Sequence, residues 1–145
     1  VIAGGKNSTV FRDEGLSDGD GVRFLGQVSD GELKALYRNA CALVFPSLTE
    51  GFGLPPLEAM SCGCPVIATT GGAVPEVCGE AAIYADPARP EEWAAAMTEI
   101  AANKALRDKF TNLGRSRAKE FTWRRAAQKL LALIKDHDPA DRGRA

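Results

Sequence analysis

Two glutamates, Glu50 and Glu58, lie eight positions apart on either side of a loop rich in glycine and proline, in the stretch PSLTEGFGLPPLEAM at residues 46–60. An ionised carboxylate only accepts hydrogen bonds, so it suits the hydroxyl groups of a sugar or a ribose. Gly51 and Gly53 permit backbone conformations that other residues avoid, and they let a ligand approach the main chain closely. The helix that begins directly after them points its N-terminal amides and positive dipole end at the same loop, which favours a phosphate. This order of groups predicts a nucleotide-sugar site.

A purely structural interpretation of the same residues is also open. Glu50 would then be a solvated loop residue, and Glu58 a glutamate in the first turns of a helix, where the helix dipole favours negative charge. The glycines and prolines would only mark a turn. Physical chemistry alone leaves both interpretations standing.

Strands and helices that alternate along the chain must position this loop. Short, nearly continuous apolar runs predict parallel strands covered on both faces, at 1–4, 22–26, 42–47, 65–69 and 81–86. Helical patterns fall at 29–40, 55–62, 74–79, 90–103, 104–121 and 122–137. The alternation followed by helices alone predicts an α/β fold, a Rossmann-like doubly wound parallel sheet with trailing C-terminal helices. Ligands on such sheets bind outside the carboxyl ends of the strands, where residues 47–53 lie.

Composition excludes several classes of protein. The chain has 145 residues, 45% of them hydrophobic and 26% charged, with a net charge of −1. A balance this close to neutral carries no electrostatic footprint for nucleic acid. The apolar runs fall short of the ~20 residues that a membrane-spanning helix needs. We expect one domain over 1–136, a disordered tail over 137–145, no nucleic-acid partner and no transmembrane segment.

The cysteines invite a metal hypothesis that the sequence does not favour. Cys62 and Cys64 form a C-x-C pair, but zinc would need two further ligands, and the only histidine, His137, lies in the polar tail. We expect reduced cysteines that serve packing, which fits a cytoplasmic location.

Other conspicuous residues have structural expectations. Gly71 and Gly72 follow another predicted strand to the same edge of the sheet, where a simple turn is expected. Trp93 and Trp123 lie on the trailing helices, where packing is expected. The basic stretch RSRAKEFTWRR, residues 115–125, is interpreted as a solvated helical face.

The stretch EGFGLPPLEAMSCGCPVIAT resembles the signature of the retaining, glycogen-synthase-like glycosyltransferases, the glycosyl transferases group 1 with the two-domain glycosyltransferase-B fold. Their Glu-x7-Glu motif matches Glu50 and Glu58. The blocks VRFLGQVSDGELKALYRNACALVFPS and GGAVPEVCGEAAIYADPARPEEWAAAM are similar to the same family, and the resemblance covers at least residues 1–125. It implies the C-terminal, nucleotide-sugar-binding half of such an enzyme. The sequence around the loop most resembles that of bacterial mannosyltransferases of surface polysaccharide and lipopolysaccharide synthesis.

The resemblance implies roles in holding the donor sugar and its diphosphate. Glu50 would contact the hydroxyl groups of the sugar near the reacting centre, as the catalytic residue. The backbone N–H groups of Phe52, Gly53 and Leu54, in the turn that Gly51 opens, would hold sugar hydroxyls and the diphosphate. The donor would be GDP-mannose or a UDP-sugar.

The resemblance also implies contacts with the nucleoside. Glu58 would bind the ribose, and the segment from Gly26 to Val28 would line the nucleobase pocket through its main chain. Gly4 and Gly5 end the first predicted strand at the same crevice, although an ordinary turn explains them equally well.

No cofactor is expected. The sequence has no acidic cluster with metal-ligand spacing such as Asp-x-Asp, so we expect metal-independent catalysis in which backbone N–H groups stabilise the charge that grows on the leaving diphosphate. An NAD-dependent oxidoreductase would need G-x-G-x-x-G after the first strand, and GGKNST does not supply it.

Parts of the family pattern are missing from this chain. Complete enzymes have an amino-terminal domain for the glycan or lipid-linked acceptor, and an Arg and a Lys that clamp the diphosphate. We expect a fragment without these or the first, central strand, inactive alone, from a cytoplasmic parent that is peripheral at the membrane. The strands at 1–4 and 42–47 would then close up directly or pair with another chain, giving self-association. A non-catalytic nucleotide-binding or assembly module is the alternative function.

Overall fold

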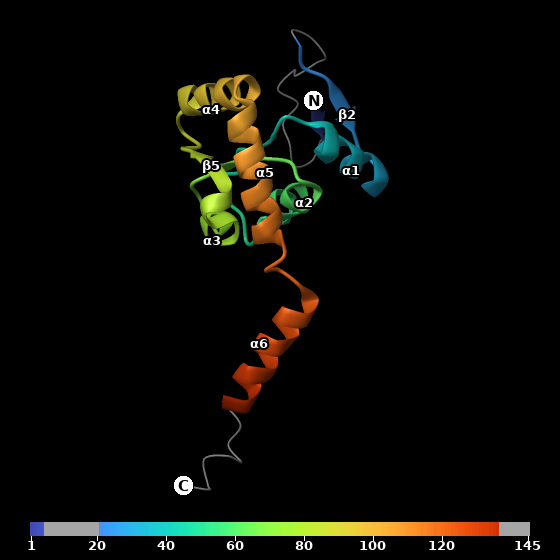
Figure 1. Cartoon of the computed structure of the whole chain (residues 1–145), viewed down its shortest axis with the longest axis vertical. Helices are drawn as coiled ribbons and strands as arrows, with labels where there is room; N and C mark the ends of the chain where they lie inside the picture. The colour runs from blue at the N-terminus through green and yellow to red at the C-terminus, as the bar shows by residue number, and fades with distance from the viewer. Residues whose placement is uncertain (5–20, 137–145) are drawn as a thin grey trace, which may run out of the picture.

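The structure, a computed structural model, describes residues 1–4 and 21–136 and has the alternating α/β order expected from the sequence (Figure 1). The strands are β1 (Ile2–Ala3), β2 (Phe24–Gly26), β3 (Leu43–Phe45), β4 (Val66–Thr69) and β5 (Ala82–Ala85). The helices are α1 (Asp30–Asn39), α2 (Leu54–Cys62), α3 (Val74–Cys78), the 3₁₀ turn η1 (Gly79–Ala81), α4 (Pro90–Ala102), α5 (Lys104–Ala118) and α6 (Trp123–Asp136). Each predicted element in these ranges is present, most of them with slightly narrower bounds.

The strands form two parallel sheets. One has the order β3-β4-β5, with Leu43 opposite Val66 and Val66 opposite Ala82, and the other is the pair β1-β2. This arrangement agrees with a doubly wound sheet that has an unfilled slot between β1 and β3. Within the described residues no ladder joins the two sheets, so the expectation that β1 and β3 close up directly is wrong. Pairing of these edges with another chain stays a prediction.

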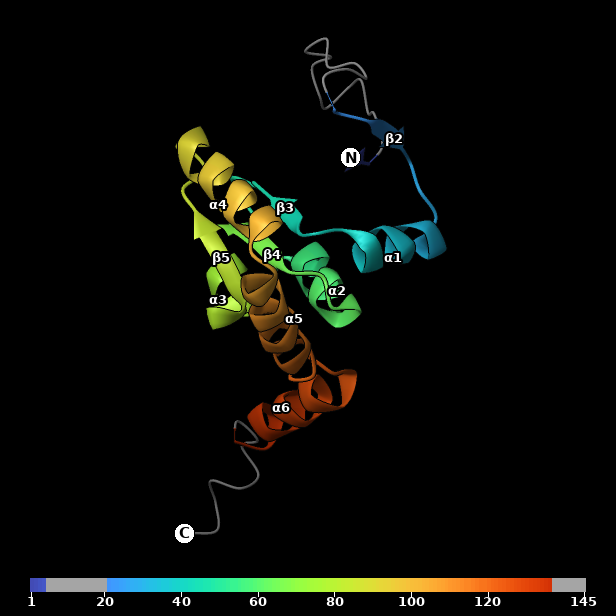
Figure 2. The same ribbon diagram turned by 45° about the horizontal axis from the view of Figure 1, so that its top comes forward.

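Helix α1 connects the two sheets along the chain. It follows β2, packs against α2 and leads back into β3, and the β1-β2 pair stands apart from the larger sheet (Figure 2). Its start is fixed by a capping box, in which Ser29 accepts from the Glu32 amide while the Glu32 carboxylate accepts from the Ser29 amide. The capping box therefore fixes the residue at which the chain that leaves β2 enters α1.

The core lies on both faces of the three-stranded sheet. All four residues of β4 are buried, and alternate side chains point to opposite faces. Val66 and Ala68 pack with α2 and α3, whereas Ile67 packs with Trp93 and Ile100 of α4. The continuous apolar run of β4 is therefore that of a central parallel strand covered on both sides.

Helix α5 fastens α2 from the outside. Gly114 is buried against Met60, and a Cβ at this glycine would lie only 3.0 Å from Met60 Cγ. The Thr111 hydroxyl donates to the Gly63 carbonyl at 3.1 Å, which caps the C-terminal end of α2. Because α2 begins at the candidate loop, α5 fixes the far end of the helix that carries it.

Helix α6 projects away from the rest of the domain (Figure 1). Trp123 at its start is 93% exposed, and Leu130 and Ile134 are exposed as well. The expected packing role is confirmed for Trp93, whose indole N–H donates to the Asp86 carbonyl at 2.8 Å, but it is wrong for Trp123. The chain turns outward after α5, so no described element covers this face. None of the described helices has both the length and the apolarity to cross a bilayer.

The cysteines divide by position. Cys64 and Cys78 are buried, and burial raises the pKa of each thiol to about 11, as expected for packing residues. Cys41 is exposed in the connection between α1 and β3, so the packing expectation is wrong there.

Candidate donor site

The candidate site is the loop of residues 46–53, which leaves the carboxyl end of β3 and enters α2. Glu50 is half-buried in this loop, and the Ser47 hydroxyl donates to Glu50 Oε1 at 3.1 Å. A hydroxyl of the same loop thus orients the carboxylate. The second carboxylate oxygen makes no hydrogen bond within the described residues.

The turn between β4 and α3 packs directly against the main chain of Glu50. Gly72 has a φ of +60°, and a Cβ there would lie 2.8 Å from the Glu50 carbonyl oxygen and 3.0 Å from its nitrogen. The Ala73 amide donates to the same carbonyl at 3.2 Å. Gly71 is also close to the loop, since a Cβ there would lie 3.3 Å from the Leu48 carbonyl oxygen. The expected turn at Gly71 and Gly72 is present, and it also fixes the backbone of Glu50.

Gly53 fixes the other end of the loop. It caps α2 in the left-handed conformation, with a φ of +92°, and a Cβ there would lie 3.4 Å from Val74 Cγ2 at the start of α3. The loops after β3 and β4 are therefore interlocked at two points, Glu50 with Gly72 and Gly53 with Val74.

The amides between these two points have no partner. Within the described residues, the N–H groups of 51–54 donate no hydrogen bond, and α2 has neither a side-chain cap nor an acidic residue in its first turn. Helix α1 has both. Unsatisfied N–H groups at a helix start whose first turn carries no acidic residue are disposed to bind an anion.

The prolines change which amides are available. Pro55 and Pro56 have no N–H, so two positions in the first turn of α2 cannot donate. Their ring geometry suits the start of a helix. The free donors therefore belong to the loop and to Leu54, and they include the amides of Phe52, Gly53 and Leu54 that the resemblance implies for the diphosphate; that these amides bind it stays a prediction.

Glu58 lies one turn into α2, exposed and turned toward α1. Tyr37 of α1 is buried, and its pKa is raised to about 12, first by burial and then by the negative charge of Glu58. The carboxylate of Glu58 therefore lies near the Tyr37 hydroxyl. Sequence reasoning did not single out Tyr37, because an aromatic on the inner face of an amphipathic helix has the appearance of an ordinary core residue.

The glycines expected near the nucleobase form a separate group. The Gly4 amide donates to the Gly26 carbonyl at 2.8 Å, at the carboxyl end of the β1-β2 pair, and Val28 follows half-buried. Gly5 lies outside the described residues. In the described part of the chain no hydrogen bond joins this group to the Glu50 loop. That the two groups share one pocket stays a prediction.

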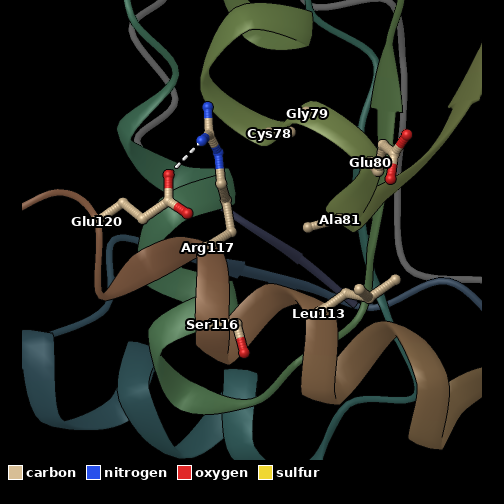
Figure 3. A pocket seen from close by; sticks show the side chains of 8 residues that line it. All are labelled: Cys78, Gly79, Glu80, Ala81, Leu113, Ser116, Arg117 and Glu120. Carbon is tan, nitrogen blue, oxygen red and sulfur yellow. Dashed lines mark hydrogen bonds and ion pairs between the residues drawn. The ribbon is translucent and has the colours of Figure 1, made fainter.

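Two surface hollows lie elsewhere, beside α5. One, of about 290 Å³, lies between Ser61 and Arg115, and the other, of about 300 Å³, lies between η1 and α5 (Figure 3). Neither is lined by the Glu50 loop. We favour the loop as the site because both hollows are wide open and lie toward the C-terminal ends of α2 and α3, away from the unpaired amides.

Arg117, at the rim of the second hollow, is not the solvated residue that the sequence predicted. Its guanidinium donates to the carbonyls of Glu76 at 2.6 Å and Val77 at 2.8 Å, and it pairs with Glu120 (Figure 3). These bonds satisfy carbonyls near the C-terminal end of α3. The interpretation of residues 115–125 as a merely solvated face is wrong at Arg117, because the sequence does not show which carbonyls come within its reach.

In residues 1–4 and 21–136 no three His, Cys, Asp or Glu side chains are grouped so that they could hold a metal ion.

Comparisons with known proteins agree on one family. The profile of the family described as glycosyl transferases group 1 matches residues 1–117. The chain is 42% identical over 102 residues to O-antigen chain mannosyltransferase B of Escherichia coli, which covers 70% of this chain and 27% of the relative. It is 36% identical over 121 residues to the D-inositol 3-phosphate glycosyltransferase of Corynebacterium jeikeium, covering 82% of this chain and 29% of the relative.

A solved structure shows the same fold. Sucrose-phosphate synthase of Thermosynechococcus elongatus superposes with a TM-score of 0.72 at 33% identity, over 81% of this chain and 30% of that one. The chain thus spans less than a third of the length of each of these three proteins.

Proposed function

The chain belongs to the glycosyl transferases group 1, and from this we propose that it is the donor-binding part of a retaining glycosyltransferase that uses a nucleoside-diphosphate sugar. One observation supports the proposal most. The consecutive unpaired amides of 51–54 lie between the carboxylates of Glu50 and Glu58. N–H groups that can donate hydrogen bonds to a diphosphate are thus flanked by carboxylates that can accept hydrogen bonds from the hydroxyl groups of the sugar and the ribose.

Glycosyl transfer needs hydrogen-bond donors of this kind at the leaving group. Transfer breaks the bond between the anomeric carbon of the sugar and a diphosphate oxygen, so negative charge grows on the leaving group. Amides that are already oriented stabilise that charge more in the transition state than in the ground state. The dipole of α2 adds to this in the same direction. Glu50, held by Ser47, would accept from the sugar hydroxyls beside the reacting carbon. We propose metal-independent transfer on these grounds.

The finer assignments are part of the proposal. Glu58 would bind the ribose diol, and the main chain from Gly26 to Val28 would meet the base. GDP-mannose is the donor that we favour, with support from the Escherichia coli relative that is named a mannosyltransferase. The acceptor would be a glycan or a lipid-linked glycan of a surface polysaccharide, bound by a second domain, with the enzyme in the cytoplasm.

The test uses the full-length parent protein. Calorimetry with GDP-mannose, GDP and UDP measures binding, and release of GDP in the presence of acceptor measures transfer. We expect Glu50→Gln to lower kcat/KM for the donor about 10- to 150-fold, since hydrogen bonds to a charged group are worth about 1.5–3 kcal/mol. Glu99→Gln, at an exposed position on α4, is the matched control and should leave both measurements unchanged.

Each outcome separates the candidate functions. Turnover by the wild type that Glu50→Gln diminishes and Glu99→Gln does not supports the proposal. Binding of GDP-mannose without transfer to any acceptor supports the non-catalytic binding module instead. Equal activity of the Glu50 and Glu99 variants would show that the loop does not hold the donor sugar.

A further inference from the structure

The loop has one contact that neither interlock explains. The ring of Phe52 meets the ring of Phe121 edge to face, with the ring centroids 5.9 Å apart and the planes at 81°. Phe121 lies in the short connection between α5 and α6, 69 positions further along the chain. Phe52 is 43% exposed, so this ring contact is a main restraint on its side chain.

Phe121 is itself held in place. Its amide donates to the Ala118 carbonyl at 3.1 Å, in the turn that ends α5. The Arg117 guanidinium lies over its ring, with Cζ 4.9 Å from the centroid. Arg117 in turn is bonded to the carbonyls of Glu76 and Val77 near the end of α3. A continuous set of contacts therefore runs from α3 through Arg117 and Phe121 to Phe52.

The position of this contact matters for the amides. Glu50 is fixed by the Gly72 turn and Gly53 by Val74, whereas Gly51 and Phe52 between them are exposed. The amide and the ring of Phe52 share one Cα, so a ring held at a fixed place limits the rotation of the peptide on either side. The middle of the unpaired run has no other side-chain anchor within the described residues.

We propose that Phe121 is a positioning residue of the donor loop, acting through the ring of Phe52 to orient the amides of 51–53. The proposal rests on the proposed function in so far as these amides bind the diphosphate. It ties the loop to the junction of α5 and α6, a segment outside the residues assigned to the proposed site.

A double-mutant cycle in the full-length parent tests the proposal. The variants are Phe121→Ala, Phe52→Ala and the two combined, and the measurement is the Kd of GDP by calorimetry. An aromatic pair of this kind corresponds to a loss of about two- to tenfold in affinity. We expect each single variant to weaken binding by that factor and the double variant to be no weaker than either. Phe121→Tyr keeps the ring and should restore wild-type affinity.

Phe110→Ala is the control for a merely structural effect. Phe110 belongs to α5, the helix that leads to Phe121, but its ring packs against the core on the α4 side. This variant should lower the Tm without changing the Kd of GDP. Fully additive losses in the cycle, or equal weakening by Phe110→Ala and Phe121→Ala, would overturn the proposal.

A second measurement needs no ligand. Glycine-selective ¹⁵N relaxation of the parent reports on the amides of Gly51 and Gly53, and we expect Phe121→Ala to lower the order parameter of Gly51 from about 0.85 toward 0.6 or less. Unchanged order parameters would refute the positioning role. If the wild type binds no nucleotide but the order parameter falls in this variant, the positioning role stands and the proposed function fails.

Discussion

Replacing Gly72 by alanine tests the interlock on which the site depends. The new Cβ would lie 2.8 Å from the carbonyl oxygen of Glu50 and 3.0 Å from its nitrogen, both of them backbone atoms that cannot swing aside. Gly72 also has a φ of +60°, a conformation that alanine rarely adopts. The substitution must therefore strain the turn and push the Glu50 loop away.

The two costs can be estimated separately. A left-handed conformation costs a non-glycine residue about 1–2 kcal/mol. Forcing extra atoms into a closely packed place costs about 1–3 kcal/mol more. We therefore expect the free energy of unfolding to fall by about 2–5 kcal/mol. For a chain of this size the Tm should drop by roughly 4–20 °C, at about 2–4 °C for each kcal/mol.

Two other glycines serve as matched controls. Gly26 has nearly the same φ, +64°, but nothing lies within 4 Å of the position of its Cβ, so Gly26→Ala measures the conformational cost alone. Gly51 lies in the candidate loop with open space and an ordinary φ, so Gly51→Ala should be neutral or slightly stabilising. Urea denaturation and thermal melting of the same chain give the comparison.

The three variants together test whether the close approach of Gly72 to Glu50 holds the loop. If Gly72→Ala is no more destabilising than Gly26→Ala, the close approach to Glu50 contributes nothing and the interlock does not hold the loop. Gly72→Asn refines the result, because asparagine tolerates the left-handed conformation but still carries a Cβ. A full rescue by asparagine would refute the steric part of the argument.

Three further outcomes follow from burial and from pKa. Burial raises the pKa of the Cys64 thiol from 9.0 to about 11, so the unfolded chain loses that proton at a lower pH than the folded chain. The free energy of unfolding should therefore fall as the pH rises from about 9 toward 11. Cys64→Ala should reduce the slope of this fall, measured by urea titrations across the same pH range. Iodoacetamide at pH 8 should alkylate exposed Cys41 in the folded chain and buried Cys78 only after unfolding, as read by mass spectrometry. Trp93→Phe should lower the Tm because it removes a buried indole and its hydrogen bond to a carbonyl, whereas Trp123→Phe should change the free energy of unfolding by no more than about 0.5 kcal/mol.

The order of elements was predictable because its signals are local. Single elements are indicated by a few neighbouring residues, without reference to the rest of the chain. Examples are the apolar run of Val66–Thr69, which indicates a strand, and the capping box of Ser29 and Glu32, which indicates the start of a helix. The exposure of Trp123 was not predictable in this way. An amphipathic helix shows that it has an apolar face, but its pattern does not tell which element covers that face.

The same distinction between local signals and contacts of distant residues applies to the candidate site. The loop, its two carboxylates and its glycines follow from residue types and spacing near Glu50. The contacts of Gly72 with Glu50 and of Phe121 with Phe52 join residues 22 and 69 positions apart, and no periodicity connects them. A pair of glycines after a strand was the only signal for the first, and nothing in the sequence signalled the second.

A site built from amides places its specificity in the shape of the backbone. The N–H groups of 51–54 are present whatever their side chains are, so the residues that matter are those that set the direction of each peptide. Gly53 and Gly72 do this by adopting a positive φ and by the absence of a Cβ, and Phe121 would do it by holding a ring. Two of these three residues lie outside the loop. If the proposed site is correct, a change in the turn after β4, or in the connection after α5, would therefore alter donor binding without touching the donor.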